Sequence, residues 1–168
     1  MINQAILNRR SVRQYSDKAV SQELINEIIK AAQFAPTAIN NRAWEFLVIE
    51  DELTKDKLYK TMDPRSRQEA VTEAPVVLIP LMNSQKSVLP VQDLSLAIQN
   101  IFIQVTELGL GSFWKNISAQ EAKDIKTAFA IPEHFTILAV LPIGYPAKEV
   151  VAHTDEEFDD AKIHWGKW

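Results

Sequence analysis

A chain of 168 residues has the size of one domain and is long enough to bury a core, and its 46% apolar content is typical of a globular protein. The net charge of −4 and the lack of a long basic run argue against nucleic-acid binding, and no apolar run is long enough to span a membrane. The absence of cysteine excludes disulfides, a thiol nucleophile and cysteine-bound metal, and it fits the reducing cytoplasm, where we expect the protein.

The first half of the chain is expected to alternate helices with short apolar strands. Ser21 is a suitable N-cap for an amphipathic helix, which Pro36 ends. Pro80 lies inside an apolar run and favours an edge strand or an early end of that strand. In chain order, the expected elements are a helix at 2–8, a helix from Ser21 to Pro36, a buried strand at 44–49, a helix at 52–62 and a buried strand at 75–82.

The second half is expected to contain the longest helix. Its apolar residues extend over much of its circumference, which predicts burial in the core, in a dimer interface or in both. Gly109 ends this helix, and Ser118 with Glu121 forms a capping box for the next one. The expected elements are a helix at 91–108, a helix from Ser118 to about Phe129, and a third apolar strand at 136–143.

Residues 147–168 differ from the rest of the chain in composition. Residues 155–160 are acidic, and residues 163–168 include two tryptophans and a histidine. This segment has too few apolar residues to build its own core. We therefore expect one domain over residues 1–168, in which 147–168 is a C-terminal extension that packs on the body or on another subunit.

A cluster of basic residues lies near the N-terminus. Three of the six arginines belong to the pentapeptide Arg9-Arg10-Ser11-Val12-Arg13. In an extended segment Arg9, Ser11 and Arg13 point to one side, where two guanidinium groups and a hydroxyl suit a phosphate. The alternative is a solvated basic turn that follows a helix.

Other site motifs give weaker signals. The histidines His134, His153 and His164 lack the close spacing of metal ligands, so we assign no metal site. No side chain has the pattern of an activated nucleophile, so a cofactor is expected to carry any chemistry, and no catalytic residue is assigned. Residues 35–44 follow a helix and precede a strand, and their small side chains would admit a flat ligand, although, taken alone, an ordinary loop is the better explanation.

Taken together, these stretches resemble the nitroreductase family of FMN-dependent oxidoreductases. The matches run in the family's order along nearly the whole chain, which makes the set specific although each motif alone is weak. They are Arg9 to Tyr15, Ala35 to Trp44, Ala74 to Val77, Gln99-Asn100, Gly109 to Trp114, Ile143 to Pro146 and Ile163 to Trp168. The resemblance implies an α+β fold, in which a sheet is flanked by helices, and an intertwined homodimer with two FMN molecules at the subunit interface.

The resemblance also implies the residues that bind FMN. Those expected to hold the phosphate and the pyrimidine side of the flavin are Arg9, Arg10, Ser11 and Arg13, with Arg13 near N1 and O2. Those expected to approach the ring from the other subunit are Pro36, Thr37, Ala38 and Asn40. The backbone around Gly111 and Ser112 is expected to border the N5 and O4 edge.

The sequence departs from the family's pattern in three places, one of which spans two residues. Thr37 replaces the usual serine, and Arg42-Ala43 replaces glutamine and proline, so that Arg42 either extends the cationic field of the pocket or points to solvent. His153 stands where a basic residue is expected beyond the Gly-Tyr-Pro turn, and it either contacts the phosphate or is an exposed tail residue.

The implied activity is hydride transfer from NADH or NADPH through FMN to a small acceptor. Nitroaromatics, quinones and related conjugated compounds are the expected acceptors. One alternative is an FMN carrier or sensor without useful turnover. Another is a structural dimer that has lost its flavin, against which the intact Arg9–Arg13 cluster argues.

Overall fold

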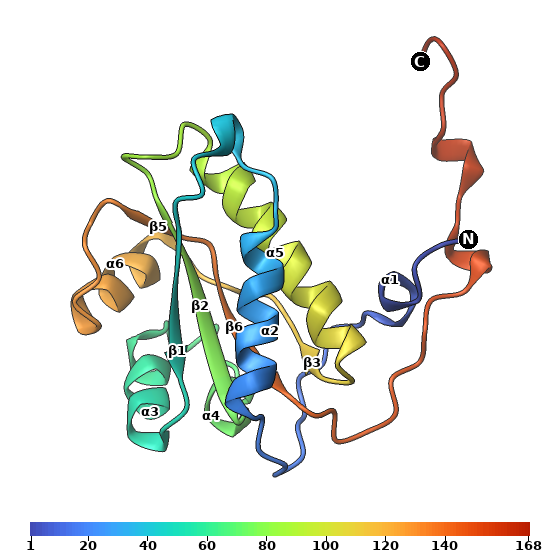
Figure 1. Cartoon of the computed structure of the whole chain (residues 1–168). Coiled ribbons are helices and arrows are strands. Elements are labelled where there is room, and N and C mark those ends of the chain that lie inside the picture. Colours follow the sequence, from blue (N-terminus) through green and yellow to red (C-terminus); the bar gives the residue numbers. More distant parts are fainter.

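The computed structural model describes all 168 residues and has three layers, a six-stranded antiparallel sheet with helices on both faces (Figure 1). The helices are α1 (Gln4–Asn8), α2 (Gln22–Gln33), η1 (Ala38–Asn40), α3 (Glu52–Thr61), α4 (Ala70–Glu73), α5 (Pro90–Glu107), α6 (Ala119–Ala128), η2 (Asp155–Glu157) and η3 (Asp160–Lys162). The strands are β1 (Trp44–Ile49), β2 (Val76–Asn83), β3 (Gly111–Ser112), β4 (Lys115–Asn116), β5 (Phe135–Ile137) and β6 (Ala139–Gly144). The α+β fold expected from the sequence is confirmed.

A cluster of buried apolar side chains joins the helices to each face of the sheet. α2 and α5 cover one face, where residues such as Ile28 and Ile98 are buried. α3, α4 and α6 cover the other face with Leu58, Val71 and Ile125. Because alternate residues of a strand point to opposite faces, β2 contributes side chains to both clusters and all of its residues are buried.

Pro80 lies inside the central strand, so the prediction of an edge strand is wrong. The sheet has the order β1-β2-β6-β3, with β5 also paired to β2 and β4 to β6. On one side of β2, Pro80 is opposite Phe46 of β1. On the other side, β6 pairs with residues 76–78 and β5 with residues 81–83. Pro80 therefore lies level with the gap between two partner strands, where a residue without an N–H is accommodated.

Two other strand predictions need correction. The run at 44–49 forms β1 as expected, but it is an edge strand in which only Ile49 is buried. The expected strand at 136–143 is divided, because Leu138 interrupts it between β5 and β6. Each of the two pieces then pairs with β2, and β6 continues along β3 and β4.

Helix α5 agrees with its prediction to within one residue at each end. Its inner face buries Leu94, Ile98 and Ile101 completely. Gly109 follows with φ of 71°, the left-handed conformation that ends a helix without strain in glycine. Val91 and Leu96 remain about half exposed, so part of its apolar surface has no partner within one chain.

The C-terminal segment begins on the body of the protein and then leaves it (Figure 1). The backbone N–H of Ala147 donates to Gln14, and that of His153 donates to Leu7. From Thr154 onward every residue is exposed, including Trp165 and Trp168. Packing of this segment on a second subunit stays a prediction. None of the helices is both long enough and apolar enough to cross a bilayer.

Replacing Ser118 by alanine should destabilise the fold through α6. The Ser118 hydroxyl accepts the N–H of Glu121 at 3.1 Å, and loss of such an N-cap lowers the free energy of unfolding by about 1 kcal/mol. Urea denaturation followed by circular dichroism measures this change. The control is Ser95→Ala, because the Ser95 hydroxyl donates only to the Val91 carbonyl within α5. Its free energy of unfolding should change by less than about 0.5 kcal/mol. Equal losses in both variants would contradict the role of the cap.

Candidate functional site

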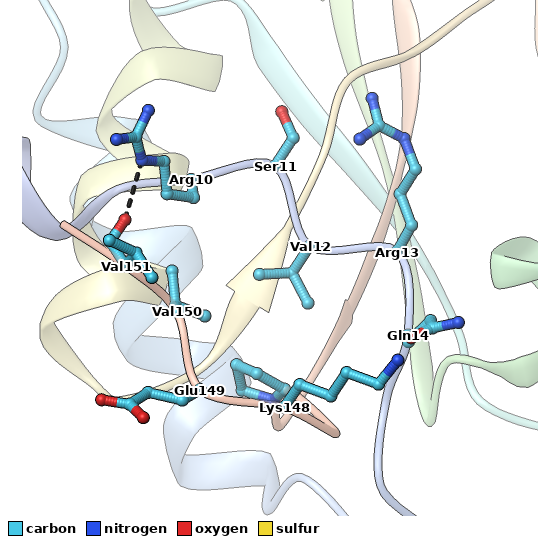
Figure 2. A pocket seen from close by; sticks show the side chains of 10 residues that line it. Arg10, Ser11, Val12, Arg13, Gln14, Lys148, Glu149, Val150 and Val151 are labelled. Carbon is cyan, nitrogen blue, oxygen red and sulfur yellow. Dashed lines mark hydrogen bonds between the residues drawn. The ribbon is translucent and has the colours of Figure 1, made fainter. Parts of the chain in front are cut away.

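The arginine-rich segment is extended and lies along the edge of the sheet beside β3. α1 ends at Arg9, and Ser11 then forms a parallel bridge with Ser112. The N–H of Val12 donates to the Ser112 carbonyl at 3.0 Å. As expected for an extended segment, Ser11 and Arg13 project to one side while Val12 projects to the other (Figure 2).

Gly111 permits this close approach of two chain segments. A Cβ atom at Gly111 would lie 2.5 Å from the Cγ2 atom of Val12, much nearer than two carbon atoms can pack. The residue beside it, Ser112, is buried, and its hydroxyl has no hydrogen-bond partner. The structure thus brings the predicted residues Ser11, Arg13, Gly111 and Ser112 together.

Two of the three clustered arginines have no protein partner. Neither Arg9 nor Arg13 forms a side-chain hydrogen bond or an ion pair, although Arg13 lies 4.8 Å from the centre of the Phe113 ring. The segment borders a hollow of about 600 Å³, and its opposite wall, residues 148–151, lies on the side toward which Val12 points (Figure 2). Its lining residues are Arg10, Ser11, Val12, Arg13, Gln14, Pro146, Lys148, Glu149, Val150 and Val151. Free guanidinium groups beside a hydroxyl can bind a phosphate.

Arg10 instead binds the C-terminal segment. Its Nε donates to the Val151 carbonyl at 2.9 Å, and its Nη2 donates to the Ala152 carbonyl and to Oε1 of Glu157. The other carboxylate oxygen of Glu157 lies 2.7 Å from Nδ1 of His153. Arg10, predicted to hold the phosphate, and His153, for which a phosphate contact is one of two alternatives, thus share a protein carboxylate in this structure. Their contact with a phosphate stays a prediction.

Tyr15 ties the arginine-rich segment to β6. Its hydroxyl lies 2.8 Å from the Val12 carbonyl and 3.1 Å from the Pro142 carbonyl. Burial raises the pKa of Tyr15 well above its usual value, against a smaller lowering by the charge of Arg13. The phenol therefore stays protonated and donates at physiological pH, which fixes the segment that presents Arg13.

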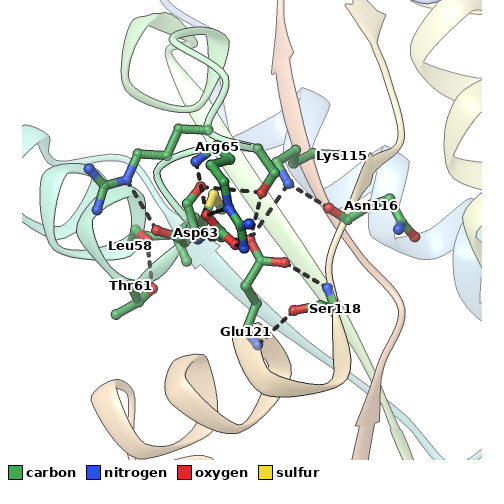
Figure 3. A network of polar contacts seen from close by, with 11 residues as sticks. Leu58, Thr61, Asp63, Arg65, Lys115, Asn116, Ser118 and Glu121 are labelled. Carbon is green, nitrogen blue, oxygen red and sulfur yellow. Dashed lines mark hydrogen bonds and ion pairs between the residues drawn. The ribbon is translucent and has the colours of Figure 1, made fainter.

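A second hollow, of about 430 Å³, also has Arg13 in its lining. Its wall contains the buried residues Lys115 and Glu121, with Nζ of Lys115 3.9 Å from Oε1 of Glu121 (Figure 3). Burial raises the pKa of Glu121, but hydrogen bonds from Ser118, Asp63 and the Ser66 hydroxyl outweigh it, so the net shift is downward. The sequence signalled only the capping role of Glu121, and no pattern indicated the buried Lys115.

The predicted ring-facing residues lie elsewhere in the chain. Pro36 and Asn40 are exposed, while Thr37 and Ala38 are half-buried, and none of these four lines a hollow. The N–H of Ala38 donates to Asp93, near the start of α5, whereas Gly111 follows the end of α5. At 1.5 Å per residue this part of the helix is roughly 20 Å long. One chain therefore does not bring the two groups of predicted residues together.

Arg42 is exposed, and its guanidinium lies 5.9 Å from the centre of the Trp44 ring. Its backbone is left-handed, with φ of 50°. Within one chain its side chain points to solvent and stacks over Trp44, and it borders neither of the two hollows beside Arg13.

The sequence and the fold of this chain are similar to those of known proteins. Residues 6–145 match the model of the Nitroreductase family. A Methanothermobacter thermautotrophicus protein named "Putative NADH dehydrogenase/NAD(P)H nitroreductase" is 37% identical, over 98% of this chain and 86% of its own length. The structure of an FMN-dependent nitroreductase from Clostridium difficile superposes with a TM-score of 0.90, at 28% identity and 98% coverage of both chains. A Desulfovibrio desulfuricans protein in complex with FMN superposes at 0.81, with 27% identity and coverage of 98% and 95%.

The attachment of the C-terminal segment should depend on pH through Glu157. Hydrogen bonding to His153, and then to Arg10, lowers the pKa of Glu157 to about 2 from an ordinary 4.5. Because the pKa is lowered in the folded state, the carboxylate holds the segment fully above about pH 4.5, and this contribution is lost as the pH falls through about 2. A carboxyl ¹³C titration by NMR measures this pKa.

The variant Arg10→Gln is the control for this titration, because it removes one cause of the shift. In this variant the pKa of Glu157 should rise toward its ordinary value. An ordinary pKa of Glu157 in the unaltered protein would show that the segment is not held by this carboxylate.

Proposed function

The chain belongs to the Nitroreductase family, and on that premise we propose that it passes a hydride from NADH or NADPH through FMN to a small conjugated acceptor, such as a nitroaromatic or a quinone. The observation that carries the proposal is the side of residues 9–13 that presents Ser11 and Arg13. There a hydroxyl and a guanidinium have no protein partner, both residues are among those that line the first hollow, and Arg9, also without a partner, lies on the same extended segment.

The residues around this hollow fit FMN. A phosphate requires cations and donors that no carboxylate already occupies, and Arg9, Ser11 and Arg13 supply them. The flavin ring requires a close backbone approach and polar groups at its edge. Val12 fills the space beside Gly111, so this glycine holds the arginine-rich segment close to β3, and the buried Ser112 hydroxyl, which has no protein partner, is a polar group available to the ring edge.

FMN, when bound, supplies the hydride chemistry, and the chain supplies position and charge. Arg13 would hold the pyrimidine edge of FMN, where its positive charge would favour the reduced, more negative form of the ring. The Phe113 ring, whose centre lies 4.8 Å from the Arg13 guanidinium, supports that side chain from one face. Tyr15 holds the backbone that carries Arg13. No side chain needs to change its protonation state in these roles.

A second copy of the chain completes the proposed site. The loop 36–42 lies roughly 20 Å along α5 from Gly111. In the dimer, the loop of one subunit therefore faces the arginine-rich segment of the other. Val91 and Leu96 on α5 and the tryptophans of the C-terminal segment are exposed apolar groups that such a dimer would cover.

The visible spectrum of the purified protein tests the proposal. Bound FMN should colour it yellow, and NADH or NADPH should bleach the colour under anaerobic conditions. Addition of a quinone or a nitroaromatic should then restore it. Flavin that is not reduced by either nicotinamide would identify a carrier or sensor, and a colourless protein that takes up no FMN would overturn the proposal.

Removing either free arginine should weaken FMN binding. Hydrogen bonds to charged groups are worth about 1.5–3 kcal/mol, so Arg9→Ala and Arg13→Ala should each reduce the binding free energy by about that amount. Titration of the apoprotein, followed by quenching of FMN fluorescence, measures the change. The control Lys123→Ala removes an exposed cation of α6 and should bind FMN normally. Unchanged affinity in both arginine variants would refute this site.

A mixed dimer should show that each site uses two chains. Arg13→Ala removes the cation of one segment, and Ala38→Phe places a large side chain in the opposing loop. If the sites are shared, a dimer with one variant on each chain keeps one intact site and should bind about one FMN instead of two. Co-expression with two affinity tags isolates this dimer, and flavin absorbance gives the stoichiometry. Loss of both sites, or a flavin-loaded monomer in sedimentation, would contradict the arrangement.

A further inference from the structure

Asp93 is a buried carboxylate without a cationic partner. It lies in the first turn of α5, is 2% exposed and forms no salt bridge. Three neutral donors satisfy it instead. Its Oδ1 accepts the N–H of Ala38 at 2.9 Å, and its Oδ2 accepts the Ser87 hydroxyl at 2.7 Å and the Asn41 amide at 3.1 Å. The positive end of the α5 dipole also favours the negative charge.

These hydrogen bonds keep Asp93 ionised. Burial raises the pKa of Asp93, but the donors Ser87, Ala38 and Asn41 outweigh burial, so its net shift is downward. Keeping a buried charge without a cation costs desolvation free energy, so the charge is expected to have a structural role. Two of its three donors belong to the loop 36–42, which indicates that Asp93 holds that loop.

The loop 36–42 has a backbone that ordinary residues disfavour. Ile39, Asn40 and Arg42 have φ values of 54°, 56° and 50°, and none is glycine. A β-branched residue such as Ile39 is a clear outlier in the left-handed region. Such conformations cost of order 1–3 kcal/mol each and persist only where surrounding contacts impose them.

Apart from the adjacent Ala43, whose N–H donates to the Asn41 side chain, Asp93 is the only hydrogen-bond partner of residues 36–42 outside the loop. The loop's other hydrogen bonds are internal, such as Asn40 to Thr37 and Asn41 to Ala38. The neighbouring Ala43 is tied to the end of β2 through Asn83. Without the carboxylate, the strained turn would have no polar contact to hold it against α5.

We propose that Asp93 is a positioning residue, which holds the loop 36–42 in the left-handed conformation that faces the flavin of the other subunit. This inference rests on the proposed function, because the flavin gives the loop its role. Asp93 touches neither cofactor nor substrate in this scheme, and it acts through Ala38 and Asn41. Its length and charge are both needed, since one oxygen must reach a backbone N–H while the other accepts two side chains.

The variant Asp93→Asn preserves shape but removes one acceptor. The new NH₂ group finds an acceptor only beside the Ser87 hydroxyl, which can accept as well as donate, so it faces the NH₂ of Asn41 and that loop contact is lost. Asn41→Ala removes the same contact from the loop side and leaves the carboxylate in place. Ile125→Ala is the stability control, because it opens the core cluster under α6 and touches no residue of the loop.

Trypsin cleavage after Arg42 in the apoprotein reports the loop without any flavin. We expect Asp93→Asn and Asn41→Ala to be cut at least about tenfold faster there, the factor that about 1.4 kcal/mol of lost restraint represents. FMN affinity and kcat should fall in both variants while the KM for NADH changes little, because the nicotinamide does not contact Asp93. The double variant should be no worse than either single variant, as for two ends of one interaction.

The outcomes separate this inference from the proposed function. If the unaltered protein binds no FMN, both are overturned. Suppose that the unaltered protein binds and reduces FMN, and that trypsin cleavage and kcat of Asp93→Asn and Asn41→Ala equal those of the unaltered protein. Then only the positioning role of Asp93 is overturned. Equal acceleration of cleavage in Ile125→Ala, or additive effects in the double variant, would also reject that role, because a general loss of stability would explain the data.

Discussion

The length of α5 sets the distance between the two halves of the candidate site. Asp93 near its start holds the loop that contains Ala38, and Gly111 follows its end beside the arginine-rich segment. A helix is stiff and this one is buried along one face, so the two halves stay roughly 20 Å apart in one chain. In the proposed function a second copy completes the site, and the same helix has the exposed Val91 and Leu96 available for that contact.

Adjacent arginines in the same pentapeptide have different environments because of backbone geometry. The segment is extended and bridged to Ser112, so successive side chains leave it in different directions. Arg10 meets the backbone of residues 151–152 and Glu157, while Arg9 and Arg13 meet no acceptor. The partnered guanidinium holds the C-terminal segment that forms one wall of the hollow. The free guanidinium groups keep their capacity for an anion.

Much of the fold could be predicted because its signals are local. The N-cap at Ser21, the capping box at Ser118 and Glu121, and the glycine after α5 mark helix ends within one turn of sequence. Strand order is not local. Pro80 signalled an edge by its missing N–H, but the gap between β5 and β6 that accommodates it is made by residues more than fifty positions away. The prediction that β1 is a buried strand was wrong for the same reason, because the neighbouring strands decide whether a strand lies at the edge or in the centre of the sheet.

For the site, the sequence by itself determined which groups are available: a cationic segment with a hydroxyl, a loop of small residues, and a glycine pair, in the order of a known family. Only the tertiary structure decided how these groups are used. It paired Arg10 and His153 with Glu157, buried Lys115 beside Glu121, and made Asp93 the support of a strained loop. Charge and hydrogen-bonding capacity belong to a residue type and can be seen in the sequence, whereas a partner depends on which distant segments the fold brings within about 3 Å.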